Sequence, residues 1–135
     1  MIRIIVCLLI FFTLSSLLSI PQKSKFDLKA SIGRGKVVYN SYCMSCHQEL
    51  GEGIDGLYPP LANSDYLMKD KKRSILQIIN GASGEMKVNG KIYNAEMSGF
   101  SLSDEETSDV LNYIRNSFGN KGAAVTPDEI KAVKK

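Results

Sequence analysis

Cys43-Met44-Ser45-Cys46-His47 is the stretch of this sequence that decides the fold. Two thiols three residues apart, followed directly by an imidazole, form the C-x-x-C-H pattern of covalent haem attachment. Each thiol adds across one vinyl group of the haem, so the two cysteines must span its two vinyl-bearing edges. His47 then lies beneath the iron and can donate a ring nitrogen as the proximal ligand. The sequence has no other histidine to compete for that position.

Other interpretations of this motif explain the sequence less well. A zinc site needs four donors, and the only further cysteine, Cys7, lies in an N-terminal apolar run. A thioredoxin-type motif would follow a buried strand, whereas residues 36–42 are predicted to be helical. A structural disulfide between two cysteines this close would be strained. We therefore predict one haem c, bound covalently through Cys43 and Cys46.

The first 20 residues form a segment of a different kind. A short basic start containing Arg3 precedes residues 4–20, which carry no charged side chain. This pattern is typical of a secretory signal peptide. As a helix, the apolar run would be roughly 26 Å long, at the short limit for a membrane span. Because Leu17 and Ser19 make a poor cleavage site, an uncleaved membrane anchor is the alternative. Either way we expect a periplasmic or other extracytoplasmic location.

The charge of the chain argues against a nucleic-acid partner. The sequence holds 17 Lys and Arg and 14 Asp and Glu, a formal net charge of +3. Loss of Arg3 with the leader leaves 16 basic and 14 acidic residues, or +2. Two ionised haem propionates would then bring the loaded protein close to neutral. Nucleic-acid binding usually requires a concentrated basic face, so we expect none.

The rest of the chain has room for one small domain. We predict a polar linker at residues 21–30 and the domain at residues 31–135. A helix is expected to begin at Ser31 as N-cap, with Gly35 and Tyr39 on one face, where a second helix could cross closely. We also predict a helical turn at residues 64–68 and a helix after Asp70 that ends at Gly81. An Asn89-Gly90 hairpin should follow. The capping box of Ser103 and Glu106 should open a helix that ends at Gly119, and a last helix should begin after Thr126.

A low-spin electron-transfer haem needs a second axial donor, and with one histidine in the chain methionine is the natural choice. Met1 lies in the leader, Met44 lies between the tethered cysteines, and Met68 is expected in a helical turn. Met86 and Met97 remain, on either side of the hairpin. Because Met97 is expected in an irregular loop, where the backbone can aim its side chain, we favour it over Met86. The alternative is that Met97 only fills a gap in the core.

Tyr58-Pro59-Pro60-Leu61 is a candidate support for His47. Proline pairs favour extended backbone and leave their carbonyl groups free. A ligating histidine usually donates its second ring N–H to such an acceptor. We predict that Pro59 provides this carbonyl; the alternative is a rigid loop without a haem contact.

With these motifs the chain resembles a class I monohaem cytochrome c. The resemblance covers nearly everything after residue 31: the Gly-x-x-x-Tyr pattern at Gly35 and Tyr39, the C-x-x-C-H motif, a proline-rich loop, a loop methionine and a last helix with an aromatic residue. Residues 93–100, 102–106 and 113–116 are similar to segments of small cytochromes that accompany bacterial terminal oxidases, quinoprotein dehydrogenases and copper nitrite reductases. Ser98 departs from the proline that follows the methionine in many relatives.

The resemblance implies an all-α fold in which three to five helices wrap around a covalent haem, with a short β-hairpin near the distal methionine. It matches Cys43 and Cys46 to the haem attachment sites, His47 to the proximal ligand and Met97 to the distal ligand. It also implies that Gly35 and Tyr39 cross Val110 and Tyr113.

The function expected from the resemblance is electron transfer without catalysis. The protein would carry one electron between respiratory or periplasmic partners, namely an oxidase, a reductase or a dehydrogenase, as a free carrier or as a subunit of a larger complex. The alternative is a peroxidase-like enzyme or a gas sensor with a labile sixth ligand. A peroxidase would need a distal acid–base group, normally a second histidine.

Overall fold

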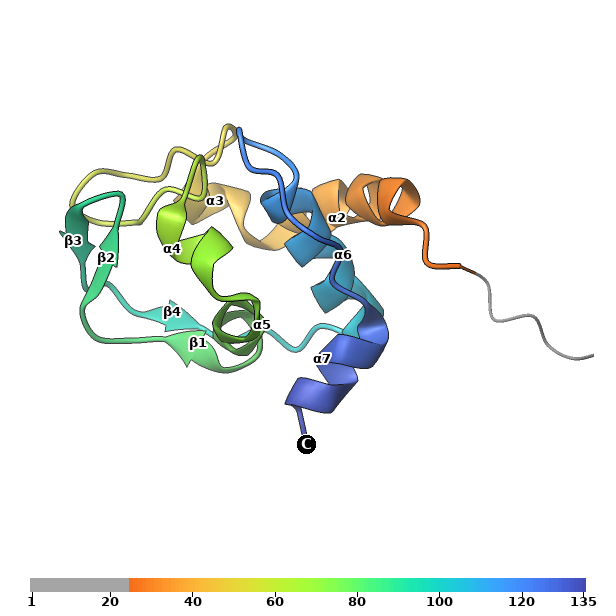
Figure 1. Ribbon diagram of the computed structural model, residues 1–135. Helices are drawn as coiled ribbons and strands as arrows, with labels where there is room; N and C mark the ends of the chain where they lie inside the picture. Colours follow the sequence, from red (N-terminus) through yellow and green to blue (C-terminus); the bar gives the residue numbers. More distant parts are fainter. Residues whose placement is uncertain (1–24) are drawn as a thin grey trace, which may run out of the picture.

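The computed structural model describes residues 25–135 (Figure 1). The predicted leader, its membrane contact and the start of the linker lie outside these residues. Among residues 25–135, no helix is long and apolar enough to cross a membrane. The elements are α2 (Leu28–Tyr42), α3 (Met44–His47), α4 (Asp65–Lys69), α5 (Lys71–Asn80), β1 (Gly81–Ala82), β2 (Met86–Val88), β3 (Lys91–Tyr93), β4 (Met97–Ser98), α6 (Asp104–Arg115) and α7 (Pro127–Val133).

The two longest helices, α2 and α6, cross and pack closely (Figure 1). A Cβ atom on Gly35 would lie 1.9 Å from the backbone oxygen of Asp109, so only glycine fits at this crossing. The rings of Tyr39 and Tyr113 lie 5.3 Å apart between their centroids. The predicted close approach is confirmed at Gly35, whereas Gly33 has nothing within 4 Å of the corresponding position.

The predicted start of the first helix is wrong. Asp27, not Ser31, is the N-cap of α2, and its carboxylate accepts a hydrogen bond of 3.0 Å from the backbone N–H of Ala30. Residues 28–30, which the sequence assigned to the linker, form the first turn of the helix. Ser31 is buried inside the domain, where its hydroxyl donates a 2.6 Å hydrogen bond to Asp109. A cap signal and a polar core residue look alike in a sequence, because Ser serves both roles.

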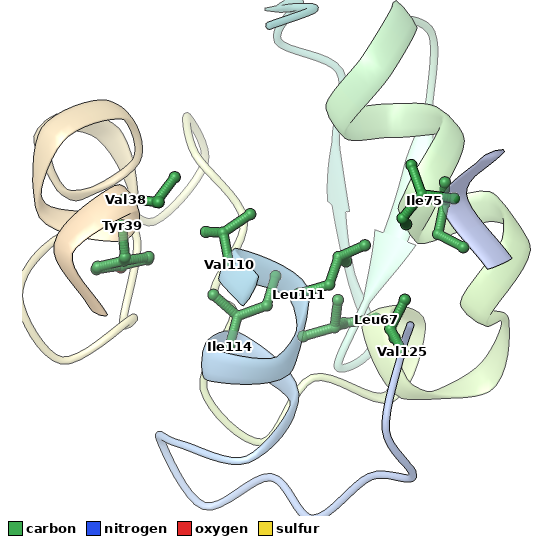
Figure 2. Packing of buried hydrophobic residues seen from close by; sticks show 9 residues of the cluster. Val38, Tyr39, Leu67, Ile75, Val110, Leu111, Ile114 and Val125 are labelled. Carbon is green, nitrogen blue, oxygen red and sulfur yellow. The ribbon is translucent and has the colours of Figure 1, made fainter. Parts of the chain in front are cut away.

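The main hydrophobic core lies on both sides of α6. Figure 2 shows the α6 side chains between those of α2 on one side and those of Leu67, Ile75 and Val125 on the other. The apolar stripe predicted for this helix therefore faces two layers of the domain. The buried residues of the core are Val38, Tyr39, Leu67, Ile75, Val110, Leu111, Ile114, Val125 and Ile130.

Most predicted helix boundaries are confirmed. Asp70 caps α5 by accepting from the N–H of Arg73, and Gly81 ends that helix. The predicted box of Ser103 and Glu106 is present at the start of α6. Thr126 caps α7, with Pro127 at its start.

The predicted end of α6 at Gly119 is wrong, because the helix stops at Arg115. Side-chain amides satisfy carbonyl groups of its last turn: Asn116 donates to the oxygen of Asn112 at 3.0 Å, and Asn120 donates to the oxygen of Ile114 at 2.8 Å. Since the terminal carbonyls of a helix lack partners within it, these amides stabilise the earlier end.

Two small antiparallel pairs of strands complete the fold. The Asn89-Gly90 hairpin is confirmed, with both residues at positive φ (49° and 84°) between β2 and β3. The second pair joins β1 to β4, with Ala82 opposite Met97. Met97 was expected in an irregular loop, and this expectation is wrong. The pairing is possible because a Cβ atom on Gly81 would lie only 2.3 Å from the oxygen of Met97, so glycine permits the approach.

Candidate cofactor site

A cavity of about 360 Å³ lies among α3, α5, the hairpin and the β1–β4 pair. Most of the side chains that line it are apolar. Its lining also brings together all of the site residues predicted from the sequence, from three separate parts of the chain: Cys43, Cys46, His47, Pro59 and Met97.

The turn from α2 into α3 places the two thiols and the imidazole. The backbone N–H of Cys43 bonds to the oxygen of Tyr39 at 2.8 Å, and that of His47 bonds to the oxygen of Cys43 at 2.9 Å. Residues i, i+3 and i+4 of such a turn share one face, and this face lines the cavity. The hydroxyl of Tyr39 donates a 2.6 Å hydrogen bond to the oxygen of Gln48, which holds the end of the turn.

The thiol of Cys43 is protonated at neutral pH in the unmodified chain. Burial, with a smaller contribution from neighbouring Cys46, raises the pKa of the Cys43 thiol to about 11. Cys43 and Cys46 are both half-buried and free of disulfide bonds. The pair is thus available for modification from the cavity side.

His47 is held in the form that can bind a metal. Its Nδ1 atom lies 3.0 Å from the carbonyl oxygen of Pro59. Because a carbonyl can only accept, Nδ1 carries the proton and Nε2 keeps a free lone pair. Burial lowers the pKa of His47, and the hydrogen bond to Pro59 opposes this shift only in part. The imidazole is therefore neutral at pH 7.

The loop between α3 and α4 positions the Pro59 carbonyl. The N–H of Gly53 donates to the oxygen of His47 at 3.0 Å, and Ile54 and Tyr58 exchange backbone hydrogen bonds of 2.9 and 2.8 Å. A Cβ atom on Gly53 would lie 2.3 Å from the oxygen of Tyr58, and Gly53 has φ +65°. Glycine is therefore needed where the loop folds back towards His47.

The four methionines of the described segment have different environments. Met97 and Met86 line the cavity, whereas Met44 is exposed and Met68 packs against the main core. Met86 is buried with Val88 and Tyr93 in a separate cluster under the hairpin. Met97 belongs to no such cluster among the described residues.

Tyr66 of α4 and Gln77 of α5 are among the polar residues of the cavity wall that sequence reasoning missed. No motif marks either of them. The apolar periodicity of α5 predicts that it is an amphipathic helix, but it does not show that Gln77 faces a cavity rather than solvent.

The donor set and the wall suit a haem c. Two thiols, a neutral imidazole and a thioether face the same apolar space, as covalent attachment and axial ligation of a porphyrin iron require. Among residues 25–135, no group of three or more His, Cys, Asp or Glu side chains is arranged to share a metal ion.

The family model for cytochrome c matches residues 32–118. This chain belongs to the cytochrome c family. The match confirms the resemblance noted in the sequence and the predicted fold class, and it means that this cytochrome c carries one covalently bound haem c.

Individual relatives of this cytochrome c agree with that assignment. Cytochrome c-552 of Thermus thermophilus is 39% identical over 110 residues, which cover 74% of this chain and 83% of that protein. The cytochrome c subunit of a quinone alcohol dehydrogenase from Gluconobacter oxydans is 32% identical over 88 residues, 64% of this chain but 18% of that subunit. The fructose dehydrogenase cytochrome subunit of Gluconobacter japonicus is 29% identical over 105 residues, 74% of this chain and 22% of that subunit.

Proposed function

We propose that this cytochrome c is an electron carrier whose haem is attached through Cys43 and Cys46, with His47 and Met97 as axial ligands. The observation that carries the proposal is that one neutral imidazole and one thioether line the same apolar cavity as the two thiols. When bound, the haem supplies a one-electron couple between Fe(II) and Fe(III).

The chain holds both ligands in fixed positions within an apolar environment. Pro59 fixes the ring of His47 through Nδ1, and pairing with Ala82 in β1 fixes the backbone of Met97. Because neither ligand has to move when the charge on the iron changes, reorganisation is small. The apolar wall and the thioether ligand both favour the less charged reduced state, which raises the reduction potential.

The partners we propose are redox proteins of the respiratory or periplasmic type: an oxidase, a reductase or a dehydrogenase. Two of the relatives are cytochrome subunits of dehydrogenases, which supports the last of these. We propose an extracytoplasmic location, with residues 1–20 as leader or anchor and the haem domain beginning at α2. We expect such a carrier to bind its redox partners briefly and through small interfaces.

The test of the proposal is the visible and near-infrared spectrum of the holoprotein. We expect wild type to show a methionine-to-ferric-iron charge-transfer band, and Met97→Ala to lose it. Met86→Leu is the matched control, because Met86 lines the same cavity, and it should keep the band. Retention of the band in Met97→Ala would refute the ligand assignment. A high-spin spectrum of wild type would instead favour an enzyme or sensor with a labile sixth ligand.

The covalent link has its own test. Extraction with acidic acetone should leave the red colour with the wild-type protein, because thioether bonds survive this treatment. Colour that moves completely into the acetone would contradict attachment through Cys43 and Cys46.

A further inference from the structure

Haem c carries two propionate carboxylates, on the porphyrin edge opposite the two thioether bonds. A carboxylate against an apolar wall is costly unless hydrogen-bond donors reach it. This inference rests on the proposed function, because attachment through Cys43 and Cys46 determines which edge of the haem faces α3. The question is which side chains of the far wall can donate.

Four polar side chains of the cavity wall do not meet this need. The hydroxyl of Ser74 is directed at two backbone oxygens, that of Leu67 at 3.1 Å and that of Asp70 at 2.9 Å. The hydroxyl oxygen of Ser64 caps α4 by accepting from the backbone N–H of Leu67 at 3.2 Å. Glu96 would repel a carboxylate, and Tyr42 is next to Cys43, at the thioether edge.

Tyr66 and Gln77 form a pair that can donate hydrogen bonds to a propionate. The amide nitrogen of Gln77 donates to the hydroxyl oxygen of Tyr66 at 3.4 Å. The hydroxyl proton of Tyr66 and the second amide proton of Gln77 thus stay available for a further acceptor. Both residues line the cavity, as do residues of α3. Figure 1 shows that α5 is separated from α3.

Arg73 places a positive charge directly behind this pair. Its guanidinium carbon lies 3.6 Å from the centroid of the Tyr66 ring, and its Nη2 donates to the backbone oxygen of Tyr66. Its Nε is buried and has no hydrogen-bond partner among the described atoms. Within residues 25–135, the ion pairs include no carboxylate on Arg73. A buried donor nitrogen without a partner calls for an acceptor, and an anionic group close to Tyr66 would supply one.

We infer that the Tyr66 hydroxyl and the Gln77 amide donate hydrogen bonds to one haem propionate, and that Arg73 is a positioning residue that holds the Tyr66 ring and balances the carboxylate charge. A carboxylate near the iron stabilises Fe(III) by Coulomb attraction. Donors and a cation that offset its charge therefore raise the reduction potential. This gives the α4–α5 wall a role in setting the potential, apart from the two axial ligands.

The test compares reduction potentials and resonance Raman spectra of holoprotein variants. Tyr66→Phe removes only the hydroxyl, so the ring and its stacking on Arg73 remain. We expect Tyr66→Phe to lower the reduction potential by up to about 59 mV. For a one-electron couple, this corresponds to a fall of up to about tenfold in the ratio of reduced to oxidised protein at a fixed electrode potential. The propionate bending bands should shift as well. Arg73→Gln should lower the potential in the same direction, and Arg73→Lys should restore most of it because the charge returns.

Tyr113→Phe is the control, since it removes a tyrosine hydroxyl outside the cavity lining and should leave the potential and the Raman bands unchanged. Wild-type potential and bands in Tyr66→Phe would overturn the inference. The axial ligands provide a separate readout: if the charge-transfer band is intact in Tyr66→Phe and the potential does not move, this inference fails while the proposed function stands.

Discussion

At the scale of single residues, Gly35 shows how one missing side chain determines the approach of two helices. The structure leaves no room for a Cβ atom there, because the backbone oxygen of Asp109 occupies the position. Gly33, two residues earlier in the same helix, has free space around it. The two glycines therefore serve different purposes, although the sequence does not distinguish them.

We expect Gly35→Ala to destabilise the holoprotein by about 1–3 kcal/mol, because α2 and α6 must move apart. Gly33→Ala is the matched control and should stabilise the protein by about 0.5–1 kcal/mol, since alanine is the better helix former and meets nothing. Chemical denaturation of both variants measures the free energy of unfolding. Equal effects of the two substitutions would contradict the close-crossing argument.

Asp109 is the second residue on which this crossing depends. Its buried carboxylate accepts hydrogen bonds from Ser31 at 2.6 Å and from two nitrogens of Arg34 at 2.6 and 2.8 Å. Asp109→Asn keeps the volume but removes the charge and one acceptor, so we expect a loss of about 1–3 kcal/mol in unfolding free energy. Glu105→Gln, which alters the exposed partner of Arg34, should change stability by less than about 1 kcal/mol. If urea denaturation gives the same loss of unfolding free energy for Asp109→Asn and Glu105→Gln, the buried carboxylate of Asp109 has no special role in stability.

At the scale of the element, α6 begins with a capping box whose strength depends on pH. The N–H and the hydroxyl of Ser103 both donate to the carboxylate of Glu106, at 2.9 and 2.7 Å. These hydrogen bonds, the backbone one first, lower the pKa of Glu106 below its ordinary value. A carboxylate with a lowered pKa in the folded state stabilises the protein above its unfolded pKa, about 4.3 for Glu. This stabilisation is lost as the pH falls through the folded value.

We therefore expect Glu106→Gln to melt at a lower temperature than wild type at pH 6, and this difference to shrink at pH 3, because glutamine does not titrate. Thermal melts of the two proteins at both pH values measure the effect. The comparison between variants removes the contribution of every other titrating group. A difference of the same size at pH 6 and pH 3 would show that the carboxylate form of Glu106 does not strengthen the cap.

At the scale of the whole molecule, the domain is built around a space that its own side chains do not fill. The space of about 360 Å³ has a largely apolar wall, and without a group to fill it that wall would be exposed to water. A domain of this size is stable by only about 5–15 kcal/mol in total. Both hydrophobic clusters of the described residues, the main core around α6 and the small cluster under the hairpin, contribute side chains to the wall of this space.

We predict that the polypeptide without haem is largely unstructured. A Cys43→Ala/Cys46→Ala variant, which cannot form thioether bonds, should lose most of the helical circular dichroism of the wild-type holoprotein. As a control for the covalent link, the circular dichroism of this variant is also measured after free haem is added and after it is removed again. Full native helicity in the variant without haem would refute the prediction, because the chain would then close its core alone.

Local signals in the sequence predicted most of the elements and the candidate site. The C-x-x-C-H motif, the caps at Asp70 and Ser103 and the Asn89-Gly90 turn each depend on residues within a few positions of one another, so their chemistry can be read directly. The hydrogen bond from His47 to Pro59 spans 12 residues of one loop and was also within reach of such reasoning.

What the sequence alone determined about this protein is the covalent chemistry of its cofactor and the order of its helices. Only the tertiary structure decided the features that join distant residues: Ser31 beneath Asp109, 78 residues away, the strand pairing of Ala82 with Met97, and the presence of Tyr66 and Gln77 on the cavity wall. The physical reason is that a cap or a turn is stabilised by its immediate neighbours, whereas a serine, a methionine or a glutamine takes its role from whatever the fold brings against it.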